Sequence, residues 1–169
     1  MPVNNHYNTS LLLTDLTFTE LNKNLTLLKN FSLIISLIVY AMSLTQTAFT
    51  FKDYDGTKSY KGFELIIFGG MAILGGGLLE WFIWLANPIY IMGLFLFYKS
   101  INRSRRNLLA ATIIAFSFMS WKEILASESG RTAPITSLNI GYYFWIISIV
   151  IATIGAFCYF YLTDKSVEK

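Results

Sequence analysis

The chain contains little charge, one cysteine and one histidine. Charged residues make up 14% of its 169 positions, well below the roughly 25% of an ordinary soluble domain. A single cysteine, Cys158, excludes an intrachain disulfide and any site built from several cysteines. The only histidine, His6, has no neighbouring ligand residues in the polar N-terminal segment. We therefore expect neither a metal nor another cofactor.

Recurring catalytic motifs are also missing from the sequence. It contains no HExxH, no Ser-His arrangement and no pair of carboxylates at membrane depth, because Glu64 lies at the end of its apolar run. Intramembrane hydrolases and metalloenzymes need such groups close together. The glycine-rich segment FGGMAILGGGLL has no lysine and no strand before it, so it is not a phosphate-binding loop. The sequence predicts a protein that is not an enzyme.

Hydrophobic residues, in contrast, are abundant. They account for 54% of the chain, and the mean hydropathy is +0.52. A surface that contacts acyl chains needs no charged coat, whereas a soluble domain of this size does. The composition predicts an all-α fold, a polytopic transmembrane helical bundle. The net charge of only +3 gives no support to nucleic-acid binding.

The apolar runs predict about five short spans within a transmembrane domain at 31–162. A bilayer core about 30 Å thick needs about 20 helical residues, and the apolar stretch 63–98 is too long for one span. We place its break where glycines 75–77 precede Glu80 and where Asn87-Pro88 begins a new helix. The predicted spans are 31–48, 63–79, 88–101, 107–121 and 140–162, between a polar, amphipathic segment 1–30 and a polar tail 163–169. The alternative has four spans, with 88–98 forming a re-entrant or interfacial helix.

A cluster of basic residues indicates how the chain is oriented in the membrane, because lysine and arginine are retained on the cytoplasmic side. Its members lie between two apolar runs: Lys99, Arg103, Arg105 and Arg106. Five spans with the N-terminus outside place nine of the thirteen basic residues on the cytoplasmic side. The four-span alternative has both termini on the cytoplasmic side and places eight basic residues there. We expect the cluster to contact anionic lipid headgroups. The short spans and loops suggest a bacterial inner (cytoplasmic) membrane.

Two stripes of small residues are candidate packing faces. They consist of Gly69, Ala72 and Gly76 at spacings i, i+3 and i+7, and of Ser148, Ala152 and Ala156 at intervals of four. Small residues let helix backbones approach closely in lipid, where the hydrophobic effect between helices is weak. These faces are predicted to pack either within the bundle or against another chain.

Glu80 and Asn87 form a candidate intramembrane polar site. An ionisable residue within a span is a functional candidate by default, and Glu80 would then line a path for cations or protons. The alternative is that Glu80 marks a helix-helix turn at the interface beside Trp81 and Trp84, and that Asn87 caps the helix that begins at Pro88.

The sequence therefore favours a small non-enzymatic membrane protein that acts through helix-helix contacts in the bilayer. Its partner would be another membrane protein or a membrane-active toxin, as for an immunity, accessory or sensor protein. The alternative is a subunit of a homo-oligomeric channel or small-solute transporter, lined by Glu80 and Asn87. The expected partners are thus the lipid bilayer and a membrane protein, a toxin or further copies of the chain, but not nucleic acid.

Overall fold

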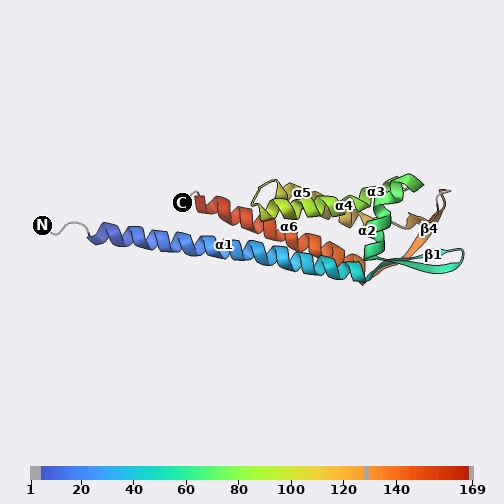
Figure 1. Ribbon diagram of the computed structural model, residues 1–169, viewed down its shortest axis with the longest axis horizontal. Helices are drawn as coiled ribbons and strands as arrows, with labels where there is room; N and C mark the ends of the chain where they lie inside the picture. The colour runs from blue at the N-terminus through green and yellow to red at the C-terminus, as the bar shows by residue number, and fades with distance from the viewer. Residues whose placement is uncertain (1–4, 128–129, 168–169) are drawn as a thin grey trace.

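The computed structural model describes residues 5–127 and 130–167 and shows an elongated molecule (Figure 1). Long helices lie along its length, and a small sheet lies at one end. The helical elements are α1 (Asn5–Thr45), α2 (Gly62–Met71), η1 (Ala72–Gly75), α3 (Leu78–Trp84), α4 (Ala86–Tyr98), α5 (Ser104–Ser117), η2 (Phe118–Ser120) and α6 (Ile140–Val167). The strands are β1 (Thr47–Asp53), β2 (Gly56–Lys61), β3 (Glu123–Leu125) and β4 (Thr132–Leu138).

The expected all-α fold is wrong, because the two polar segments at 47–61 and 123–138 form an antiparallel four-stranded sheet. Its strand order is β2-β1-β4-β3. The β1-β2 hairpin turns at Gly56, whose φ of +120° favours glycine. In β1, Phe49 and Phe51 are buried, and both pair with β4. The pairing of β1 with β4 joins the two hairpins into one sheet, and because it links residues far apart in sequence it gives no local signal.

The five predicted spans are corrected as well. Within the described residues, three helices are long and apolar enough to cross a membrane, namely 22–45, 78–98 and 140–166. The predicted span 63–79 is instead broken, because α2 ends at Met71 and Gly76 has a φ of +85°. The segment 88–98, re-entrant in the four-span alternative, continues the helix that begins at Leu78.

The remaining predicted boundaries also shift. The 107–121 span corresponds to α5, which has 14 residues and is followed by η2. The segment 1–30 is not separate from the first span, since α1 runs unbroken from Asn5 to Thr45. The tail predicted at 163–169 continues α6 as far as Val167. Residues 1–4 and 168–169 of these two segments lie outside the described part of the chain.

The bundle consists of helices that pass alternately toward the sheet and away from it. α1 runs toward the sheet, α4 runs away, α5 returns and α6 runs away again (Figure 1). α2 lies across the sheet end of the bundle. The N-terminal part of α1, the α4–α5 loop and the C-terminal end of α6 therefore all point away from the sheet.

Candidate functional site

A cavity of about 110 Å³ lies where the bundle meets the sheet. Residues from α1, α2, α3, α4, η2, α6, β1 and β3 line it, and its walls are mostly apolar. Both candidate polar residues of the sequence, Glu80 and Asn87, contribute to its lining. The structure thus brings these two residues, one from α3 and one from α4, to the same cavity.

Asn87 connects three helices through its side-chain amide. Its Oδ1 accepts hydrogen bonds from Tyr40 Oη on α1 at 3.0 Å and from Trp145 Nε1 on α6 at 2.9 Å. Its Nδ2 donates to the carbonyl oxygen of Trp84 at 3.0 Å. Asn87 is the second residue of α4, and the residue at the N-cap position is Leu85. Asn87 therefore cross-links the bundle and does not cap a helix.

Glu80 joins α3 to the sheet. Its Oε1 accepts a hydrogen bond from the backbone N–H of Leu125 on β3 at 2.8 Å. This contact places the carboxylate at the boundary between the bundle and the sheet, beside the cavity. No ion pair of Glu80 occurs among residues 5–127 and 130–167.

The indole of Trp84 holds α2 against the cavity. Its Nε1 donates to the carbonyl oxygen of Ile66 at 2.9 Å. A Cβ added at Gly69 would lie 2.6 Å from Trp84 Cδ1, so only glycine fits there. A Cβ added at Gly70 would lie 3.0 Å from Cζ2 of the same ring. Gly69, Ala72 and Gly76 do not share one continuous helical face, because α2 ends before the last two.

The second stripe of small residues is used inside the bundle. Ser148, Ala152 and Ala156 have no exposed surface. The carbonyl oxygen of Ser148 accepts a hydrogen bond from Ser36 Oγ on α1 at 2.7 Å. The neighbouring Gly155 also faces α1, since a Cβ added there would lie 2.4 Å from Ser32 Oγ. This stripe packs α6 against α1 and is not available to another chain.

The basic cluster lies at the opposite end of the molecule from the cavity. Lys99, Arg103 and Arg106 are exposed. Arg105 is tied to the protein, since its Nε donates to Asn102 Oδ1 at 2.6 Å and its guanidinium lies 5.4 Å from the centre of the Phe160 ring. The cluster is therefore far from Glu80 and Asn87 and belongs to a separate surface.

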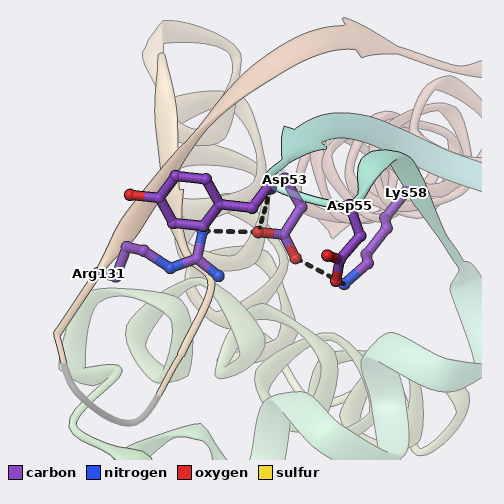
Figure 2. Close-up of polar contacts among 5 residues, drawn as sticks. Asp53, Asp55, Lys58 and Arg131 are labelled. Carbon is purple, nitrogen blue, oxygen red and sulfur yellow. Dashed lines mark hydrogen bonds and ion pairs between the residues drawn. The ribbon is translucent and has the colours of Figure 1, made fainter.

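One charged group that the sequence analysis missed lies on the sheet, around Asp53 (Figure 2). Asp53 accepts hydrogen bonds from Lys58 Nζ and from Arg131 Nη1, both at 2.6 Å, and from the backbone N–H of Tyr54 at 2.8 Å. The Arg131 guanidinium also lies 4.6 Å from the centre of the Tyr54 ring. These contacts fasten the β1-β2 hairpin to the segment that enters β4.

The same contacts explain the ionisation of the group. The hydrogen bonds from Lys58 and then from Arg131 hold the pKa of the Asp53 carboxyl well below its usual range. The hydrogen bond to Asp53 in turn raises the pKa of Lys58. The Asp53 side chain is only 7% exposed, because its own partners cover it at the edge of the molecule. Arg131 is far from Asp53 in sequence, so no local pattern predicts this pairing.

Among residues 5–127 and 130–167, no group of three or more His, Cys, Asp or Glu side chains is placed to hold a metal ion. Comparison of the chain with protein-family models, curated proteins and solved structures finds no match.

Proposed function

We propose that the chain is a multi-pass membrane protein that acts by contact with another membrane protein and does not catalyse a reaction. The observation that supports membrane insertion is the distribution of exposed apolar side chains. Large exposed hydrophobic residues occur along every α-helix, as at Phe31, Ile91, Ile113 and Ile154. On the sheet only Tyr54 is of this kind. Such a surface is costly in water and needs no compensation in lipid.

The path of the chain suggests four crossings with the sheet outside the cytoplasm. α1, α3–α4, α5 and α6 would cross, and α5 with η2 would reach about 27 Å, close to the thickness of a bilayer core of about 30 Å. Seven described basic residues lie at the end away from the sheet: Lys23, Lys29, Lys99, Arg103, Arg105, Arg106 and Lys165. Five lie at the sheet end: Lys52, Lys58, Lys61, Lys122 and Arg131. The positive-inside rule then favours cytoplasmic termini.

The contact surface that we propose is the apolar arm, defined as α2 and η1 (residues 62–75). Neither element contains a buried residue. The arm lies across the bundle, so it is not needed to cross the bilayer (Figure 1). It contains no charge after Glu64, and Leu74 near its end is 82% exposed. Because the stripe on α6 is already packed, we propose the arm, which crosses the bundle, as the surface for a partner helix.

The channel alternative is less favoured by the geometry. A channel would require Glu80 and Asn87 to face a continuous water path. Both side chains are instead hydrogen-bonded to neighbouring elements, and the cavity between them has mostly apolar walls.

Membrane topology is tested with single cysteines in a Cys158→Ser background. A membrane-impermeant maleimide applied to intact cells should label Tyr54→Cys on the sheet and leave Asn102→Cys in the α4–α5 loop unlabelled until the cells are opened. Both positions are exposed. Labelling of both positions in intact cells, or of Asn102→Cys alone, would contradict the proposed topology.

Partner contact is tested with a photo-crosslinking amino acid at Leu74 in native membranes. We expect a protein adduct of one defined mass, which should be lost when Phe68→Asn is added to the arm. The matched control is the same crosslinker at Ile113, an exposed residue of α5 that would face lipid. Adducts with lipid alone at both positions would refute the contact function, and adducts of twice the chain's mass would assign the contact to a second copy.

A further inference from the structure

The walls of the cavity beneath the sheet are rich in aromatic rings. Phe49, Trp84, Phe118, Tyr142 and Trp145 all contribute to its lining. They come from four different elements, β1, α3, η2 and α6, so the ring of aromatics exists only in the folded protein. The faces of aromatic rings carry partial negative charge and attract cations, most strongly where water is excluded.

The hydrogen-bonding groups of the cavity are nearly all used by the protein. Asn87 is bonded to Tyr40, Trp145 and Trp84, and Tyr142 Oη donates to the carbonyl oxygen of Ala115 at 2.9 Å. Glu80 differs, because the hydrogen bond that its side chain makes within the described residues uses one oxygen, Oε1, which accepts from the backbone N–H of Leu125. Its charge meets no cationic side chain among residues 5–127 and 130–167. The carboxylate is therefore the group left to recognise a ligand.

We propose that this cavity binds a small organic ammonium ion, with its nitrogen toward Glu80 and its alkyl groups against the aromatic rings. A carboxylate beside a largely apolar space is costly unless a cation pairs with it. The aromatic walls add cation–π attraction, and together these features favour an ammonium over an anion or a neutral molecule. A volume of about 110 Å³ limits the ligand to about five heavy atoms, since an engineered cavity of roughly 150 Å³ holds the six carbon atoms of benzene.

The test compares butylammonium chloride with butan-1-ol, which has the same chain length and no charge. Binding is followed by the fluorescence of the tryptophans, two of which line the cavity, using the full chain in detergent micelles. Butylammonium should bind saturably and at least about tenfold more tightly than butanol. Glu80→Gln keeps an oxygen for the Leu125 N–H and should remove this preference. The matched control is Glu64→Gln, which lies outside the cavity and should bind as the wild type does.

A second variant keeps the test decisive if Glu80→Gln fails to fold. Phe118→Leu removes one ring from the wall and should weaken butylammonium binding severalfold while butanol binding changes little. Equal affinities for butylammonium and butanol would leave a merely apolar cavity and overturn the proposal. The proposal would also be overturned if butylammonium did not bind saturably, or if Glu64→Gln lost as much butylammonium affinity as Glu80→Gln. None of these outcomes depends on the proposed partner contact, because the arm's exposed face is not the site tested.

Discussion

Gly155 on α6 is a position where one methyl group should separate the two longest helices. A Cβ built there lies 2.4 Å from Ser32 Oγ and 2.5 Å from Ser32 Cβ on α1. Nonbonded carbon atoms prefer about 3.5–4.0 Å, so Gly155→Ala requires α1 and α6 to move apart by about 1 Å. Both residues are buried, and the helices pack along much of their length, which leaves little room for local adjustment.

The expected cost of Gly155→Ala is about 1–3 kcal/mol of unfolding free energy, the range for overpacking a close-packed interior. For a chain of this size each kcal/mol corresponds to roughly 2–4 °C in Tm. Thermal unfolding in detergent micelles, followed by circular dichroism, should therefore show Tm lowered by about 5 °C. The neighbouring Ile154 is exposed, so Ile154→Val, which also alters one methyl group, should leave Tm nearly unchanged.

A double-mutant cycle identifies Ser32 as the cause. Ser32→Ala removes only Oγ and leaves Cβ at 2.5 Å from the added methyl group, so it should recover little of the stability that Gly155→Ala loses. Ser32→Gly removes both atoms and should recover most of the loss, apart from about 1 kcal/mol for glycine in a helix. Wild-type stability of Gly155→Ala, or full rescue by Ser32→Ala, would refute this account of the α1–α6 contact.

Three further predictions concern the polar contacts. Asp53→Asn should lower Tm at pH 7. Because the folded-state pKa of Asp53 is depressed, the Tm difference between this variant and the wild type should stay constant above about pH 4 and shrink as the pH falls further. As the control, Asp55→Asn changes an 84% exposed side chain and should alter Tm little. Asn87→Ala leaves two partly buried donors, Tyr40 Oη and Trp145 Nε1, without their acceptor and should cost about 1–2 kcal/mol in chemical unfolding. Trp84→Phe removes the hydrogen bond to Ile66 and should speed hydrogen exchange across residues 63–75.

Each of these predictions has an outcome that contradicts it. A gap between Asp53→Asn and the wild type that persists unchanged to pH 2 would show that the carboxylate's ionisation does not stabilise the hairpin. An Asn87→Ala variant as stable as the wild type would mean that water replaces the amide. Exchange in residues 63–75 that is unaffected by Trp84→Phe would show that another contact holds the apolar arm.

Long apolar stretches were predictable because hydropathy is a sum over neighbouring residues. The run that became most of α6 contains no charge from Ile140 to Leu162, and its helix follows from length and composition alone. The low charge and high apolar content similarly indicated helices that are long and apolar enough to cross a membrane. The break near Gly75–Gly77 was also visible, although the structure uses it to end a crosswise arm and not a span.

Glu80 and Asn87 show how far such local reasoning extends. A carboxylate and an amide inside an apolar stretch stand out in the sequence, so both were candidates. Their partners did not stand out, because Leu125, Tyr40 and Trp145 lie 45, 47 and 58 positions away. The cavity that the two side chains share, and its aromatic walls, therefore arise only when α1, α3, α4 and α6 come together.

The sheet is the feature that the tertiary structure alone decided. The segments at 47–61 and 123–138 are polar and short, and by themselves they resemble loops. β1 follows α1 and β4 precedes α6, and these two helices pack side by side, so the two strands meet at the same end of the bundle and pair there. Composition thus determined which parts of this chain are helical and apolar, whereas the pairing of β1 with β4, the Asp53–Arg131 contact and the cavity depended on contacts between residues far apart in sequence.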